Sequence, residues 1–196
     1  MNWWTLVALI VFVYILSALR RAKLEFWYFL IGSAGVFMIS MLFIRPILIN
    51  PLIQAVTMIT GNIGEMLNLF EGYPEYALLF VEYKSGAISL IVDYECAGII
   101  EMAAFFSLLM FFPAYLRMEK ILVGICGGLY LFFANVLRLV VICVTISIFG
   151  NDAYFLVHSV IGRIIFYGLS MVLYYVVFTK TQIIRQKVGN FSYEDK

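Results

Sequence analysis

The sequence contains little charge. Charged residues make up 13% of the 196 positions and hydrophobic residues 64%, whereas a soluble domain carries roughly 25% charged and about 45–50% apolar residues. This composition excludes an ordinary soluble domain and predicts a membrane protein of one domain in contact with the lipid bilayer. The net charge of +1 is not informative about nucleic acid, because what matters is where each charge lies; we expect no nucleic-acid partner.

Cysteine and histidine are also scarce. The three cysteines do not form a disulfide framework, because Cys126 and Cys143 lie inside apolar runs, where we expect inert packing. Since His158 is the only histidine and one nearby cysteine leaves too few ligands, we expect no metal site and no cofactor. Paired interrupted spans, which are typical of transporters, are not found in the sequence either.

Five apolar segments are long enough to cross a bilayer, which takes about 20 residues. They are residues 3–19, 26–44, 97–112, 121–149 and 159–178. The first is followed by the basic turn Arg20-Arg21-Ala22-Lys23 and not by a small-residue cleavage site, so we interpret it as a retained span. The expected fold is an all-α polytopic membrane domain over residues 1–187, with a polar cytoplasmic tail at 188–196.

The basic residues predict an orientation, because Lys and Arg favour the cytoplasmic ends of spans. Most of them fall on one side if residues 45–95 lie outside the cell, and most acidic residues then face outward. This arrangement predicts a multi-pass protein of the plasma membrane with a cytoplasmic C-terminus.

Two segments between the second and third spans are predicted to lie on the outer surface. Residues 46–71 are apolar enough to cross, but a crossing would separate the basic turns. Their apolar and polar residues recur on opposite helical faces, which predicts an amphipathic helix in the interface. Residues 76–94 are rich in β-branched and aromatic residues around Lys84-Ser85-Gly86 and predict a short β-hairpin. We expect both to form a rim that guides a membrane-anchored substrate.

Three residues whose side chains can take part in catalysis are predicted to lie at the same depth in the bilayer. Arg138 lies roughly 27 Å beyond Lys120 on a helix rising about 1.5 Å per residue. Because the hydrocarbon core is about 30 Å thick, Arg138 lies near the outer face. Cys96 opens the third span and His158 opens the fifth at that same face. Ionisable residues within a bilayer are costly and indicate function by default.

The chemistry that such a set supports is nucleophilic acyl transfer. A thiolate attacks a carbonyl, a histidine takes the thiol proton, and an arginine stabilises the developing oxyanion or holds a carboxylate. The alternative is structural: Cys96 as a small filler, His158 at headgroup level, and Arg138 reaching the interface by snorkelling.

Three further polar residues accompany Arg138. Asn135 shares its helix face and is expected to orient it. Glu101 is expected to pair with Arg138 or tune it, and Arg163 is expected to snorkel more than to take part in chemistry. All three are candidates for substrate binding or for support of the catalytic residues.

Four motifs in this order resemble the exosortase/archaeosortase family of membrane-embedded cysteine transpeptidases. They are Cys96-Ala97-Gly98, Phe112-Pro113, Ala134-Asn135-Val136-Leu137-Arg138 and His158. The resemblance covers about residues 90–170. With about five spans where many relatives have around eight, the chain is similar to the compact Gram-positive type called exosortase G.

The resemblance implies a role for each matching residue: Cys96 as nucleophile, His158 as general base and acid, and Arg138 as the transition-state cation. It implies a membrane-anchored protein substrate whose C-terminal sorting signal comprises a short motif, an apolar helix and a basic tail. Cleavage would pass through a thioester at the outer face, followed by transfer or release at the cell surface. Glu101 follows the cysteine motif where many relatives carry a basic or neutral residue.

Two alternatives stay open from sequence. A hydrolytic protease would form the same acyl-enzyme and differ only in the nucleophile that resolves it. A non-catalytic or accessory membrane factor for surface glycopolymer assembly, partnering a glycosyltransferase, would tolerate loss of the Cys96 thiol.

Overall fold

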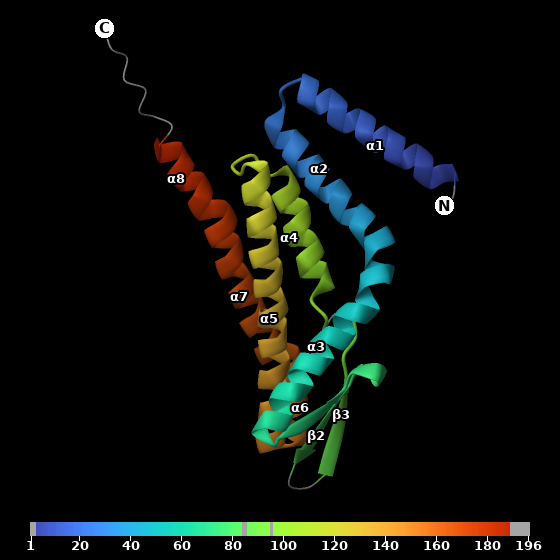
Figure 1. The fold of residues 1–196 in the computed structure, drawn as a ribbon, viewed down its shortest axis with the longest axis vertical. Helices are drawn as coiled ribbons and strands as arrows, with labels where there is room; N and C mark the ends of the chain where they lie inside the picture. Colours follow the sequence, from blue (N-terminus) through green and yellow to red (C-terminus); the bar gives the residue numbers. More distant parts are fainter. Residues whose placement is uncertain (1–2, 84–85, 95, 189–196) are drawn as a thin grey trace.

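The computed structural model describes residues 3–83, 86–94 and 96–188. The turn expected at Lys84-Ser85 and the tail from residue 189 lie outside them. The α-helices are α1 (Trp3–Arg21), α2 (Glu25–Ile39), α3 (Arg45–Leu67), α4 (Ile99–Phe111), α5 (Arg117–Phe149), α6 (Tyr154–Leu156), α7 (Gly162–Tyr174) and α8 (Thr181–Val188). The strands are β1 (Phe70–Tyr73), β2 (Leu78–Tyr83) and β3 (Gly86–Ile91). Figure 1 shows α4, α5 and α7 as a bundle with the sheet at one end.

Three helical segments in the described part of the chain are long and apolar enough to cross a membrane. They are Glu25–Leu67, Arg117–Phe149 and Asn151–Ile184. The 13 residues of α4 extend only about 20 Å, less than the roughly 30 Å of a hydrocarbon core. The prediction of a mostly helical membrane protein is confirmed, and the count of five crossings stays a prediction.

The amphipathic segment differs from the prediction at both ends. The helix that contains α3 begins at Glu25, because a π-helical turn at Ser40–Ile44 joins α2 to α3 without a break. It ends at Leu67 and not at residue 71, because Asn68 closes it with a left-handed backbone (φ 53°). Residues 70–73 then form β1, so the expected hairpin is a three-stranded antiparallel sheet in the order β1-β2-β3.

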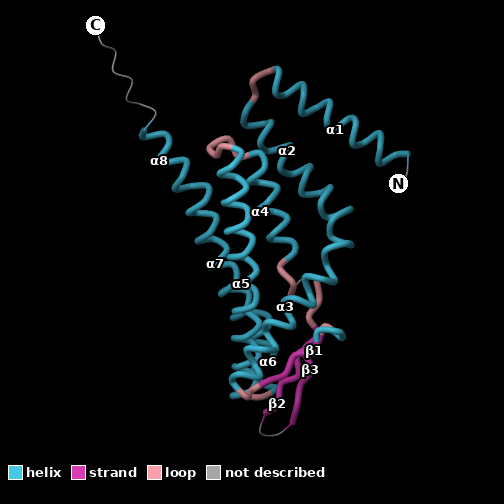
Figure 2. The backbone as a smooth tube through the Cα atoms, viewed as in Figure 1, coloured by secondary structure: helices cyan, strands magenta, loops and turns pink. Residues whose placement is uncertain are grey.

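The sheet packs its inner face against α3 and α5. Side chains alternate along β2, so that Leu79 and Val81 are buried while Glu82 is exposed. Val81 pairs with Phe70 of β1, and Leu79 pairs with Leu90 of β3. All belong to one apolar core with residues of α3 and α5. Figure 2 shows the strands together at one end of the helices. This core also contains Cys96, so the sheet fixes the backbone that leads to the candidate nucleophile.

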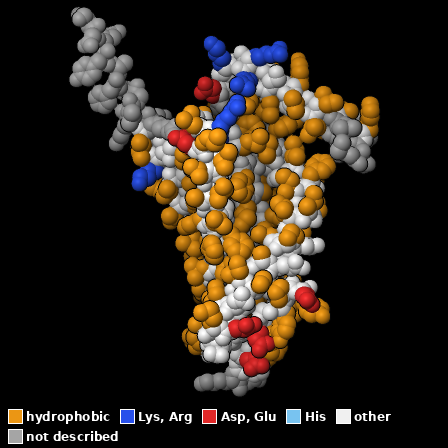
Figure 3. Space-filling view, viewed as in Figure 1, with side chains coloured by type: hydrophobic (Ala, Val, Ile, Leu, Met, Phe, Trp, Pro, Cys, Tyr) orange, Lys and Arg blue, Asp and Glu red, His pale blue; other side chains and the backbone are white. Residues whose placement is uncertain are grey.

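The charges lie at opposite ends of the molecule. Figure 3 shows Lys and Arg gathered around the α1–α2 turn and the neighbouring α4–α5 turn, and most Asp and Glu at the sheet. We call these the basic end and the sheet end. The separation matches the charge pattern from which the orientation was predicted.

Gly61 provides a test of how the sheet is seated on α3. A Cβ atom at Gly61 would lie 2.6 Å from the Cα of Gly72 in β1, a backbone atom that cannot swing aside. We expect Gly61→Ala to destabilise the protein by about 1–3 kcal/mol, as overpacking does. Gly168→Ala is the matched control, because nothing lies within 4 Å of its Cβ. It should be neutral or stabilising by roughly 0.5–1 kcal/mol.

Thermal unfolding of both variants in detergent checks this expectation. A melting temperature for Gly61→Ala equal to that of Gly168→Ala would show that the sheet does not contact α3 at this distance.

Candidate active site

Cys96 lies in the short connection between β3 and α4. Its backbone N–H donates to a carboxylate oxygen of Asp93 at 3.0 Å and to the Asp93 carbonyl at 3.1 Å. Gly98 then turns the chain into α4 with φ 72°, a conformation that L side chains rarely adopt. Cys96 as a whole residue is only 4% exposed. The turn therefore holds Cys96 against the core and not on an open loop.

Asn135 of α5 fixes this turn from the other side. Its Nδ2 donates to the Cys96 carbonyl oxygen at 2.6 Å, and the residue is fully buried. The Asn135 side chain also lies close to Gly98. A Cβ atom added at Gly98 would be 3.4 Å from the Asn135 Cγ. Orientation of Arg138 by Asn135 was the prediction, whereas the hydrogen bond seen runs from Asn135 to the backbone of Cys96.

His158 approaches the thiol from the last helical segment. Its Nε2 lies 3.8 Å from the Cys96 Sγ. It belongs to a π-helical turn, Val157–Ile161, and His158 itself is half-buried. The ring stacks on Tyr154 with a centroid separation of 5.5 Å. Residues 62 positions apart in the chain thus form a thiol–imidazole pair, the arrangement in which a base takes the proton of a nucleophile.

Arg138 is buried beside this pair. It is 5% exposed, and its Nε has no hydrogen-bond partner among the residues that the structure describes. Its guanidinium carbon lies 5.8 Å from the ring centroid of Phe166 in α7. A buried polar group without a partner is costly, and Arg138 also lines the pocket that contains Cys96 and His158.

A pocket of about 160 Å³ joins these groups. Its lining residues come from the β3–α4 turn, α4, α5 and the last helical segment, and they are Asp93, Cys96, Ile100, Glu101, Arg138, His158, Arg163 and Tyr167. Glu101 and Arg138 both line it, close enough for the arginine charge to act on the carboxyl group. Arg163, expected to snorkel away, also lines this pocket. The structure thus brings together five of the six residues predicted from sequence and places the sixth, Asn135, behind Cys96; their roles in chemistry stay predictions.

Asp93 and Tyr167 are the residues that sequence reasoning did not include. Asp93 is one of the acidic residues expected to face outward, and its position three residues before Cys96 is also the spacing of a side chain that caps backbone N–H groups. Tyr167 follows Arg163 by four residues and so shares its helix face.

The charges around Cys96 act in opposite directions on the pKa of its thiol. Burial raises the pKa of the Cys96 thiol to about 11, Arg138 acts to lower it, and the Asp93 carboxylate raises it. Cys96 precedes α4 and lies outside the apolar helices. The resting thiol is therefore protonated near neutral pH, so a base must remove the proton as the sulfur attacks.

The rate of thiol alkylation should report this pKa. With Cys126 and Cys143 replaced by alanine, we expect labelling of Cys96 to rise about tenfold per pH unit from pH 7 to 9 without a plateau, because only the thiolate reacts. Arg138→Gln should slow labelling at each pH, since it removes the charge that lowers the pKa. Asp93→Asn should accelerate it, since it removes a charge that raises the pKa.

Maleimide labelling followed by intact-protein mass spectrometry measures the rates. The denatured protein is the control and should level off near the ordinary thiol pKa of about 8.5. A plateau below pH 8 in the folded protein would instead indicate a thiolate–imidazolium pair at rest.

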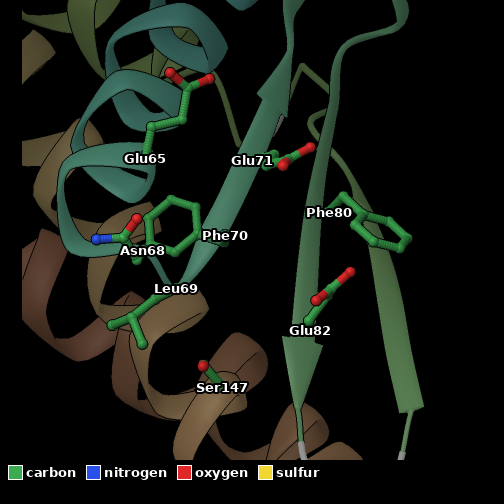
Figure 4. A pocket seen from close by; sticks show the side chains of 8 residues that line it. All are labelled: Glu65, Asn68, Leu69, Phe70, Glu71, Phe80, Glu82 and Ser147. Carbon is green, nitrogen blue, oxygen red and sulfur yellow. The ribbon is translucent and has the colours of Figure 1, made fainter.

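A second pocket, of about 320 Å³, lies at the sheet end. Figure 4 shows its carboxylates on three elements, with Glu65 on α3, Glu71 on β1 and Glu82 on β2. The Tyr73 hydroxyl donates to Glu71 at 2.6 Å. Within the described ranges, no group of three or more His, Cys, Asp or Glu is placed to hold a metal. This pocket shares no lining residue with the one at Cys96.

Comparison with known families decides the identity of the chain. The sequence model described as Transmembrane exosortase (Exosortase_EpsH) matches residues 2–176. The chain belongs to the transmembrane exosortase family. The match includes the N-terminal spans, which lie outside the four motifs. Exosortases are in general cysteine transpeptidase-like proteins. The family resemblance is confirmed, while assignment to the compact Gram-positive type stays a prediction. No curated protein and no solved structure gave a significant match.

Proposed function

We propose that this exosortase is a cysteine transpeptidase or protease that cleaves a membrane-anchored C-terminal sorting signal. The observation that carries the proposal is the 3.8 Å separation between the Cys96 Sγ and the His158 Nε2. The pair lines a pocket with the buried Arg138, whose Nε has no hydrogen-bond partner in the described part of the chain. A nucleophile, a base and a cation for an oxyanion are the parts that acyl transfer needs.

The first half of the reaction forms a thioester. His158 Nε2 takes the Cys96 proton while the sulfur bonds to the carbonyl carbon of the scissile peptide. The carbonyl π electrons move to the oxygen, and the Arg138 guanidinium stabilises that oxyanion. When the carbonyl re-forms, the C–N bond breaks and His158 gives its proton to the leaving amine.

The second half regenerates the thiol. A water molecule or an acceptor amine gives a proton to His158 and attacks the thioester carbonyl, again with the oxyanion beside Arg138. The C–S bond then breaks, and the sulfur takes the proton back from His158. Water yields a released product and an amine yields a transferred one, so the acceptor that reaches the thioester decides between proteolysis and transpeptidation.

The proposed topology places this chemistry at the outer face of the plasma membrane, with the basic end and the C-terminus in the cytoplasm. Cys96 lies on the sheet side of α4, and a substrate held in the bilayer by its own apolar helix would present its cleavage site at that depth. The α3 helix and the sheet are then the rim beside the site.

Comparison of membrane proteins from two cell lines tests the proposal. Cells that carry the wild-type protein or the Cys96→Ala variant are fractionated, and C-terminal peptides are quantified by mass spectrometry. We expect proteins with an apolar helix and a basic tail to keep these tails only in the variant. Identical peptide profiles, with a surface glycopolymer lost on gene deletion but restored by Cys96→Ala, would support the accessory role instead.

A further inference from the structure

The largest cavity described at the basic end lies between two helix turns. It has a volume of about 790 Å³, within the range of about 300–1,000 Å³ typical of small-ligand sites. Arg20 and Lys23 reach it from the α1–α2 turn, while Arg117 and Lys120 reach it from the start of α5. Glu25 is the one carboxylate among its lining residues. Four cations from segments far apart in sequence thus surround one cavity.

The cavity walls are held together by packing and by a hydrogen bond. The rings of Tyr28 in α2 and Phe111 in α4 meet edge to face with centroids 5.4 Å apart. The Lys120 Nζ donates to the carbonyl oxygen of Met110 at 2.7 Å, which ties α5 to the end of α4. The helix α2 also begins here without a side-chain cap at Leu24, and Glu25 is the acidic residue of its first turn. The helix dipole favours negative charge at this end, so the four cations and not the helix end carry the case for an anion.

The apolar side of the cavity identifies the kind of anion. Leu19, Leu24 and Phe29 line it together with the cations, so the site offers hydrocarbon contact next to positive charge. A free phosphate ion would leave that apolar surface without a partner, whereas a phospholipid brings acyl chains along with its phosphate. Basic pockets between helices on the cytoplasmic side are typical lipid headgroup sites.

We propose that this cavity binds the headgroup of an anionic phospholipid, with the phosphate among Arg20, Lys23, Arg117 and Lys120. The site shares no lining residue with the pocket at Cys96. Binding is therefore independent of the cysteine chemistry, and the Cys96→Ala variant should bind lipid like the wild type.

Native mass spectrometry of the delipidated protein, titrated with phosphatidylglycerol or with phosphatidylcholine of the same acyl chains, tests the proposal. We expect tighter binding of phosphatidylglycerol. The double variant Arg20→Gln/Arg117→Gln should lose about 25-fold in its affinity, at about fivefold for each cation near an anionic headgroup. The matched control is Arg21→Gln/Lys180→Gln, which removes the same charge from residues outside the cavity lining and should change the affinity less than twofold.

Two results would overturn the proposal. Equal losses in both double variants would show attraction to the basic end in general and no built site. Competition by glycerol phosphate at the same concentration as the lipid would show that a soluble phosphate is the ligand. Thermal unfolding without lipid establishes that each variant is folded, and Arg20→Lys/Arg117→Lys should retain most of the affinity.

Discussion

Replacing Cys96 with alanine should reduce cleavage by at least about 10⁴-fold, because loss of the nucleophile leaves only the binding and oxyanion contributions to catalysis. Among the described residues that line the pocket with Arg138 and His158, Cys96 is the one with a sulfur atom, so we expect neither of the other cysteines to replace it. The measurement is the initial rate at which the purified protein, in lipid nanodiscs, cleaves a substrate found by the tail comparison.

Two cysteines serve as controls for this effect. Cys126→Ala removes an exposed thiol, and Cys143→Ala removes a buried thiol in the same helix. Both should keep their cleavage rate per folded molecule. If Cys96→Ala cleaves at the wild-type rate, cleavage does not pass through a thioester at Cys96 and the assignment of Cys96 as nucleophile is wrong.

The Cys96→Ser variant separates geometry from reactivity. A hydroxyl fits where the thiol was, but its proton is far harder to remove, so His158 alone cannot activate it to the same degree. We expect the serine variant to be folded and nearly as inactive as the alanine variant. A serine enzyme within tenfold of the wild type would mean that formation of the acyl-enzyme does not limit the rate.

The convergence of the site could be predicted from sequence because depth in a bilayer is a one-dimensional quantity. Counting along a helix from Lys120 places Arg138 at the level where Cys96 and His158 begin their spans. Distance within that plane depends on how the helices pack, which hydropathy does not encode. The 3.8 Å contact between Cys96 and His158 therefore came only from the structure.

Near the sheet, the segments are too short for hydrophobic periodicity to predict the secondary structure. Residues 70–73 carry too few side chains to separate a period of 3.6 from a period of 2, and their apolar content extended the predicted helix past Leu67. The end of that helix is set by Asn68, a residue that tolerates the left-handed conformation. In the helical pattern of residues 46–71 Asn68 falls on the polar face, and that position gives no signal that the helix ends there.

The protonation state of the Cys96 thiol depends on its burial in the folded protein. Sequence reasoning gave Arg138 as a cation able to stabilise a thiolate, and its charge does act in that direction. Desolvation of a residue that is 4% exposed acts more strongly in the opposite direction. Burial of a single residue in a loop follows from the whole tertiary arrangement, here the core formed by α3, α5 and the sheet.

His158→Ala should lower the rate of cleavage by about 10³-fold or more. A thiol with a pKa of about 11 is almost entirely protonated at pH 7, so the enzyme depends on a base at the moment of attack. Raising the pH supplies thiolate without a base. The activity lost in His158→Ala should therefore recover partly between pH 8 and 10, whereas the activity of Cys96→Ala should not recover at any pH.

Combining the two substitutions tests whether the residues act as one unit. If every step in which His158 moves a proton depends on the Cys96 thioester, then Cys96→Ala/His158→Ala should be no slower than Cys96→Ala alone, because a base without its nucleophile contributes nothing. Tyr154→Phe is the matched control for the position of the ring, since it keeps the stacking at 5.5 Å and removes only a hydroxyl. It should change the rate less than about threefold. If the double variant loses as much activity as the product of the two single losses, His158 acts on the substrate independently of the thiol. The transfer of the Cys96 proton to His158 would then be wrong.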